Sequence, residues 1–140
     1  MEFVNRSNEI RRLLRVTHSG EAALVVVWGR RRLGKSRLLT EWSRRVAGAY
    51  WVADESASPI QRRYLAEELE SVLPGFSAVT YPDWNALLQR LSRDARYRRW
   101  RGPLIIDELP YLVAAAPELP SLLQKWVDRE KREGGMVLAL

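Results

Sequence analysis

The chain has 140 residues, and its 23 Lys and Arg against 17 Asp and Glu give a formal net charge of +6 at pH 7. This length suits one domain or part of one, and a hydrophobic share of 46% can build a core, which excludes a wholly disordered chain. The absence of Cys excludes disulfides, thiolate metal sites and a Cys nucleophile, and the single His18 argues against a His-based metal site or a Ser-His triad.

The sequence predicts neither a membrane span nor a signal peptide. Its longest apolar run, near residues 22–28, falls short of the roughly 18 residues that a span needs. Its start, Met-Glu-Phe-Val-Asn-Arg, lacks a basic segment followed by an apolar one. We therefore expect a soluble, cytoplasmic chain with no membrane partner.

Strand and helix patterns alternate along the chain. Short apolar runs predict strands buried on both faces at residues 24–28, 49–53, 104–106 and 136–140. Amphipathic stretches, the fourth of them opened by Asp83 as N-cap, predict helices at residues 7–16, 35–47, 59–73, 84–97 and 119–132. This alternation predicts an α/β fold in which helices cover both faces of a parallel sheet.

The loop between the first predicted strand and the second predicted helix carries the strongest motif. Residues 29–36 read Gly-Arg-Arg-Arg-Leu-Gly-Lys-Ser and fit the Walker A pattern G-x-x-x-x-G-K-[ST]. Gly29 and Gly34 permit a tight backbone whose N–H groups turn toward an anion, and the start of the helix adds its partial positive charge. Lys35 can reach the β- and γ-phosphates of a nucleoside triphosphate, and the Ser36 hydroxyl can bind Mg²⁺.

The arginines in and beside this motif are open to two interpretations. Arg30, Arg31 and Arg32 either face solvent, because the backbone cradles the phosphates, or contact phosphate or a neighbouring subunit. Arg37 either approaches the α-phosphate or sugar or lies at the surface. The predicted nucleotide-binding residues here are Gly29, Arg30, Arg31, Arg32, Leu33, Gly34, Lys35, Ser36 and Arg37.

A second motif follows the third predicted strand. Residues 104–108 read Leu-Ile-Ile-Asp-Glu, the Walker B pattern, which puts Asp107 at the carboxyl edge of a buried strand. Ligands of open α/β sheets bind at that edge. Asp107 can hold Mg²⁺ through its water shell, and Glu108 can orient or deprotonate an attacking water. The alternative is that Asp107 caps a helix and Glu108 is a surface residue.

With both motifs present, the sequence resembles the AAA+ ATPases of the archaeal-type group, which are close to the signal-transducing NTPases. The resemblance spans essentially all 140 residues and rests on the opening Phe-Val-Asn-Arg at 3–6 with Glu9, on residues 28–38, on residues 105–112 and on a helix containing residues 122–126. It implies a three-layer P-loop NTPase core with strand order 5-1-4-3-2. It also implies ATP rather than GTP, with Phe3, Val4 and Arg6 near the adenine. From the residues alone, Phe3 and Val4 are equally well an apolar anchor.

The resemblance implies further elements after Leu140. In the family, the fourth strand ends in a sensor residue, and a fifth strand, a helical lid and an arginine finger follow. We therefore expect residues 1–140 to form the N-terminal portion of an AAA+ ATPase domain, completed by another chain or prone to self-association. An arginine finger contributes about 10³–10⁵ to the rate, so we expect this segment to bind ATP and Mg²⁺ but to hydrolyse ATP slowly.

The basic residues suggest an alternative function, a nucleic-acid-binding module whose basic surface is regulated by nucleotide. Residues 97–101, Tyr-Arg-Arg-Trp-Arg, combine aromatic side chains that can stack on bases with arginines that can pair with phosphates. The other interpretation is a surface helix end. Residues 54–56, Asp-Glu-Ser, are expected at the carboxyl edge of the sheet, either as polar groups that support the nucleotide site from behind or as a loop carrying a helix cap. Trp42, Trp84 and Trp126 are expected to be core residues.

Overall fold

The computed structural model describes residues 11–15, 23–25, 35–133 and 137–139. Its strands are β1 (Ala23–Val25), β2 (Ala49–Val52), β3 (Leu104–Asp107) and β4 (Val137–Ala139). Its helices are α2 (Lys35–Val46), α3 (Ser58–Leu69), α4 (Trp84–Arg98), α5 (Leu109–Ala115) and α6 (Leu119–Glu133), with a 3-10 turn at Phe76–Ala78 and helical residues at 11–15. Each strand predicted from the sequence thus has a counterpart in the described part of the chain.

The four strands form one parallel sheet in the order β1-β4-β3-β2. Ala23 pairs with Val137, Leu104 pairs with Leu138, and Tyr50 pairs with Ile105. β4 therefore lies between β1 and β3, although it is the last strand of the chain. All four strands run the same way, so their carboxyl ends meet at one edge of the sheet.

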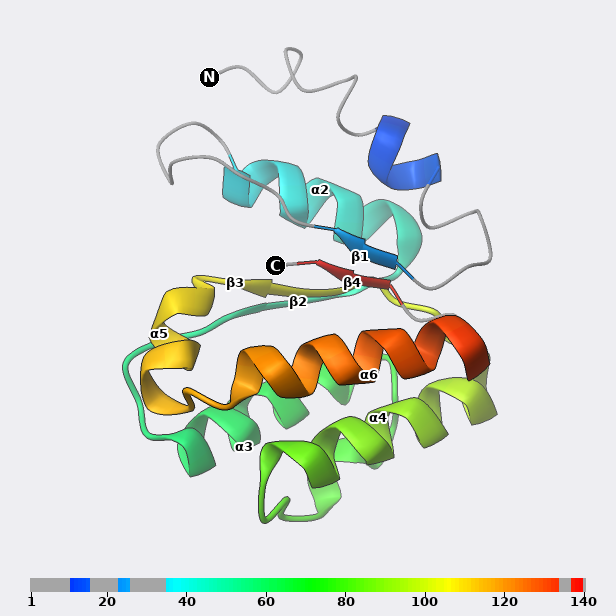
Figure 1. The fold of residues 1–140 in the computed structure, drawn as a ribbon. Coiled ribbons are helices and arrows are strands. Elements are labelled where there is room, and N and C mark those ends of the chain that lie inside the picture. The colour runs from blue at the N-terminus through cyan, green and yellow to red at the C-terminus, as the bar shows by residue number, and fades with distance from the viewer. Residues whose placement is uncertain (1–10, 16–22, 26–34, 134–136, 140) are drawn as a thin grey trace.

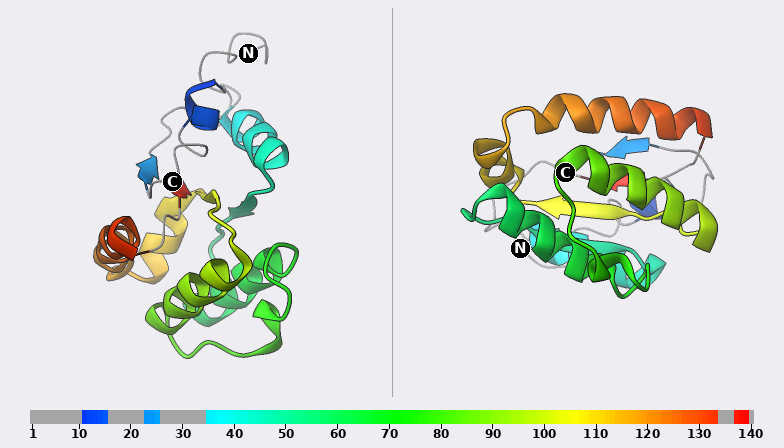
Figure 2. Two further views of the ribbon diagram at one scale, coloured as in Figure 1. Left: turned by 90° about the vertical axis from the view of Figure 1, so that its right-hand side faces the viewer. Right: turned by 90° about the horizontal axis from the view of Figure 1, so that it is seen from below.

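Helices cover both faces of the sheet, which confirms the predicted α/β class. Figure 1 shows α2 on one face and α3, α4 and α6 on the other, and Figure 2 shows the same layers from two further sides. Ile105 packs with Leu38, Leu39 and Trp42 under α2. Leu104 and Ile106 point the opposite way into the larger cluster under α3, α4, α5 and α6. The run Leu-Ile-Ile is apolar throughout because both of its faces are buried.

Local sequence signals explain where several helices begin. Asp83 is the N-cap of α4, as predicted, and its side chain accepts a hydrogen bond from the Ala86 N–H at 2.7 Å. Pro59 and Pro110 stand in the first turns of α3 and α5, where a missing N–H costs nothing. Trp42, Trp84 and Trp126 are buried, as predicted. In the described ranges, no helix has the length and apolar composition of a membrane span.

The helices of the structure differ from the prediction at two places. The helix α3 ends at Leu69 and not at residue 73, because the Glu70 carboxylate accepts hydrogen bonds from Gly75 and Ser77 and holds a turn there. Helix α5 was not predicted at all. It is short and follows β3 without a connecting loop, so its apolar residues resemble a continuation of the strand.

Candidate functional site

Two carboxylates stand where β3 meets α5. Asp107 is the last residue of β3 and is 2% exposed, and Glu108 follows it as the N-cap of α5. Both lie at the carboxyl edge of the sheet, on the left in Figure 1. The sequence prediction that Asp107 ends a buried strand is therefore confirmed.

The Asp107 carboxylate is held by a neighbouring strand and by the chain that follows it. The Tyr50 hydroxyl on β2 donates to Asp107 Oδ2 at 2.6 Å, and the Glu108 N–H donates to Asp107 Oδ1 at 2.9 Å. The Ala53 N–H also donates to the Asp107 carbonyl at 3.0 Å. These contacts orient a buried acidic group at the sheet edge.

Tyr50 was not singled out in the sequence, although the strand register explains its contact. Tyr50 pairs with Ile105 in the parallel ladder, and Asp107 lies two residues beyond Ile105 on the same face. A long side chain from Tyr50 can therefore reach the carboxylate along that face. An aromatic residue two positions before the end of an adjacent strand is the signal that could have found it.

Glu108 has an unusual backbone. Its φ of 59° and ψ of 39° lie in the left-handed region, which costs an L-residue roughly 1–2 kcal/mol. The conformation turns the chain sharply from β3 into α5. It leaves the Glu108 side chain partly exposed at a cavity of about 540 Å³, which it lines together with residues 52–56 and Tyr111.

The loop at residues 54–56 forms the opposite wall of this cavity, but its predicted role as a helix cap is wrong. The N-cap of α3 is Ala57, and no side chain caps it. Asp54 Oδ1 instead accepts from the Ser56 N–H at 2.8 Å, and this backbone bond together with the Ser56 hydroxyl lowers the pKa of Asp54. Buried Gln61 fixes the loop by accepting from the Asp54 N–H and donating to the Ser56 carbonyl, each at 3.0 Å.

The first turn of α2 lies at the same edge of the sheet. Lys35 and Ser36 open this helix, and Figure 1 shows its start on the side where β3 leads into α5. Asp107 shares the face of the sheet on which Ile105 packs against α2. The structure thus brings the first turn of α2 and the end of β3 to one edge and one face of the sheet.

Of the other predicted site residues, Arg37 lies in the part of the chain that the structure describes. Arg37 is exposed on α2. The loop residues Gly29, Arg30, Arg31, Arg32, Leu33 and Gly34 lie outside the described residues, as do Phe3, Val4 and Arg6. Within the described ranges, no group of three or more His, Cys, Asp or Glu side chains could hold a metal.

The comparison with protein families is decisive at this point, because residues 3–139 match the ATPase domain found predominantly in Archaea. The chain belongs to this archaeal-type ATPase family. It is also similar to an uncharacterized protein of Methanocaldococcus jannaschii, with 28% identity over 126 residues, which are 90% of this chain and 26% of that protein. The chain therefore spans about a quarter of the length of the curated relative that it matches. No solved structure matches it.

Membership of the archaeal-type ATPase family indicates a function for the carboxyl edge of the sheet. An ATPase domain binds a nucleotide, and in α/β sheets the binding crevice lies outside the carboxyl ends of the strands. That is the edge at which Asp107, Glu108 and the start of α2 meet.

Proposed function

We propose that the chain is an ATP-binding, Mg²⁺-dependent ATPase domain of the AAA+ P-loop class. Residues 1–140 would hold its Walker A segment at 29–36 and its Walker B segment at 104–108. The observation that carries this proposal is the shared position of Asp107 and the first turn of α2, at one edge and on one face of the sheet. The strand order β1-β4-β3-β2 also supports it, since it agrees with the 1-4-3-2 part of the expected order 5-1-4-3-2.

Each motif residue has a role in this proposal. The 29–34 loop and Lys35 bind the phosphates, with Arg30, Arg31, Arg32, Leu33 and Arg37 along the same segment, and residues Phe3, Val4 and Arg6 lie near the adenine. Ser36 and Asp107 hold Mg²⁺, directly or through water. One hydroxyl and one carboxylate suit this ion, because nucleotide-bound Mg²⁺ takes its other ligands from phosphate and water. Bound Mg²⁺ neutralises developing phosphate charge.

Glu108 is the proposed catalytic base. Its partly exposed position at the cavity by the sheet edge would let it meet a water that attacks the γ-phosphate. We further propose that hydrolysis by this segment is slow, because the resemblance assigns the sensor residue and arginine finger to positions outside it. We also propose that the segment self-associates or binds a second chain, and a mass that rises with concentration in light scattering would support self-association.

Nucleotide affinity measured by calorimetry tests the binding proposal. We expect Lys35→Ala to abolish ATP binding, since it removes the point charge on the phosphates, whereas Lys125→Ala, at an exposed position of α6, leaves affinity unchanged. Unchanged affinity in the Lys35 variant would overturn the Walker A assignment.

The metal role needs a separate comparison. We expect Asp107→Asn to remove the gain in ATP affinity that Mg²⁺ gives and to leave affinity measured in EDTA intact. Asp128→Asn, at an exposed position of α6, serves as the matched control. If the Asp107 variant keeps the full response to Mg²⁺, Asp107 does not hold the metal.

A further inference from the structure

A cavity of about 420 Å³ lies between α3 and the segment that leads from the 3-10 turn into α4. Helices α3 and α4 cover the face of the sheet opposite α2 (Figure 1), and the cavity shares no lining residue with the one at Glu108. Its walls come from Pro59, Ile60, Arg62, Arg63 and Ala66 of α3 and from residues 77–82. These lining residues include two arginines and no Asp or Glu.

Arg62 is the buried charge of this cavity. Its side chain belongs to a residue that is only 9% exposed. Its Nε–H donates to the Tyr81 carbonyl at 3.0 Å, and its Nη2–H donates to the Pro82 carbonyl at 3.2 Å. The guanidinium also lies 5.8 Å from the centre of the Trp84 ring. These contacts hold the guanidinium in one position on the cavity wall.

The contacts of Arg62 leave part of its guanidinium unsatisfied. A guanidinium carries five N–H donors and one positive charge, and the two carbonyls accept from two donors without neutralising the charge. In the described part of the chain, Arg62 forms no ion pair and its Nη1 forms no hydrogen bond. Nη1 is not among the buried side-chain atoms that lack a partner, so it is accessible from outside. Because buried charges are normally paired, this accessible cation favours an anionic ligand.

Arg63 adds a second positive charge to the same cavity. It is exposed on α3, and its guanidinium lies 5.7 Å from the centre of the Tyr64 ring. Among the described residues, Arg63 forms no ion pair with a carboxylate either. An anion in this cavity would therefore meet two cations and no acidic side chain.

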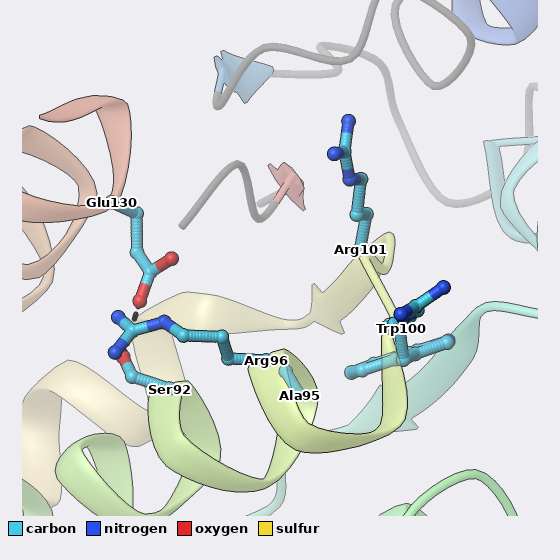
Figure 3. Close-up of a pocket in the computed structure, with 7 residues that line it drawn as sticks. Ser92, Ala95, Arg96, Trp100, Arg101 and Glu130 are labelled. Atoms are coloured by element: carbon cyan, nitrogen blue, oxygen red, sulfur yellow. Dashed lines mark hydrogen bonds between the residues drawn. The ribbon is translucent and has the colours of Figure 1, made fainter. Parts of the chain in front are cut away.

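A second basic cavity, at the end of α4, differs in this respect. Figure 3 shows that Arg96 reaches toward the carboxylate of Glu130 there, and this buried carboxylate also accepts a hydrogen bond from the Ser92 hydroxyl. That cavity thus contains its own acid. Of the two, the cavity at Arg62 is the better candidate for an anionic group.

The remaining wall of the cavity at Arg62 is apolar and exposes backbone. Ile60 and Val79 are large apolar residues that are 38% and 46% exposed. Val79 is extended, with φ −120° and ψ 158°, and within the described ranges neither Val79 nor Thr80 forms a backbone hydrogen bond. An exposed, extended segment of this kind can pair with a second extended chain.

We infer that the cavity at Arg62 binds the carboxyl-terminal end of a partner polypeptide whose last residue is apolar. The terminal carboxylate pairs with Arg62, and Arg63 adds to the attraction. The last side chain contacts Ile60 and Val79, and the residues before it pair with the backbone of residues 79–80. In a terminal residue the carboxylate and the side chain share one Cα, so both reach the cavity together. A free phosphate would use the arginines but give no role to the apolar wall.

Fluorescence anisotropy with a labelled peptide that ends in Thr-Val-Leu tests this inference without ATP, so its outcome is independent of the nucleotide site. The matched probe has the same sequence and a terminal carboxamide. We expect the carboxamide to bind about tenfold more weakly or worse, because it removes a hydrogen-bonded charge from Arg62. This comparison changes only the ligand, so it needs no variant of Arg62, whose contacts also hold the segment into α4. Equal affinity of the two probes, or no binding of the acid at low salt, would overturn the inference.

Two substitutions on the cavity wall test the site itself. Val79→Asp should weaken peptide binding about tenfold or more, since it places a like charge beside the carboxylate, whereas Ser121→Asp, exposed on α6, should have no effect. Arg63→Gln should weaken binding about two- to fivefold, as the loss of an exposed ion pair does, whereas Arg98→Gln, exposed on α4, should not. Equal losses in the controls would overturn the inference. So would tighter binding of an amidated peptide that carries Glu in place of the final Leu, because an internal acidic segment would then be the ligand.

Discussion

The hydroxyl of Tyr50 donates a hydrogen bond of 2.6 Å to Oδ2 of Asp107, which joins β2 to β3 at the carboxyl edge of the sheet. The other oxygen, Oδ1, accepts from the Glu108 N–H, so both oxygens of the carboxylate are oriented. Groups that hydrogen-bond to a metal-binding carboxylate orient it and contribute to metal affinity. Tyr50 is therefore a positioning residue for the proposed Mg²⁺ site.

We predict that Tyr50→Phe weakens Mg²⁺ binding in the presence of ATP about tenfold, because loss of such an outer contact typically costs about 10–100-fold. ATP affinity in EDTA should not change, since Tyr50 is not among the proposed phosphate-binding residues. Calorimetric titration of Mg²⁺ into the protein with ATP measures the Mg²⁺ affinity, and calorimetric titration of ATP in EDTA measures the ATP affinity. Tyr64→Phe at a partly exposed position of α3 is the control. An equal loss of ATP affinity with and without Mg²⁺ would mean that Tyr50 acts only on the fold.

The difference between Tyr50 and Asp107 indicates how far the sequence predicts this site. Asp107 was predicted because an apolar run ends in acidic residues, a pattern within one segment. The contact from Tyr50 depends on which residue of β2 pairs with Ile105. The two residues are 55 positions apart, and neither segment alone determines the register between their strands. Helix α5 was missed for a related reason: the left-handed Glu108 that separates it from β3 is a glutamate and not a glycine.

Replacing Glu108 should separate stability from catalysis. In Glu108→Gly, loss of the left-handed strain, roughly 1–2 kcal/mol, is offset in part by the greater freedom of glycine in the unfolded chain. We predict a variant as stable as the parent or more stable by up to about 1 kcal/mol, whereas Glu108→Gln keeps the strain and the parent stability. Both should lose ATP hydrolysis. Urea denaturation compares the two, and a glycine variant less stable than the glutamine variant would contradict the prediction.

The carboxylate of Glu70 should make the fold sensitive to acid. Hydrogen bonds from the Gly75 N–H and from the hydroxyl and N–H of Ser77 lower the pKa of Glu70 from 4.5 to about 2. The lowered value means that the folded state binds this proton less readily than the unfolded state does. The stability it contributes is therefore fully present above pH 4.5 and is lost as the pH falls toward 2.

We predict that Glu70→Gln lowers the thermal midpoint at pH 7 and that the difference from the parent disappears near pH 2. Thermal unfolding followed by circular dichroism across this range measures the difference. Glu68→Gln, two residues earlier and exposed on α3, is the control and should follow the parent at every pH. A gap between the parent and Glu70→Gln that stays constant from pH 7 to about pH 2 would show that the charge of Glu70 has no part in the effect.

The turn between α2 and β2 contains Ala47 followed by Gly48, and we expect the stability of the fold to depend on this order. A Cβ added at Gly48 would lie 2.8 Å from both the carbonyl oxygen and Cδ of Pro103, and that oxygen already accepts the Ala49 N–H. Because backbone atoms cannot move aside cheaply, we predict that Gly48→Ala destabilises the fold by about 1–3 kcal/mol. The preceding Ala47 has a φ of 54°, so Ala47→Gly should be neutral or stabilising. Urea denaturation of the two variants measures this contrast in the free energy of unfolding. Equal losses of stability would mean that the freedom of the unfolded chain, and not contact with Pro103, determines which residue is tolerated in the turn.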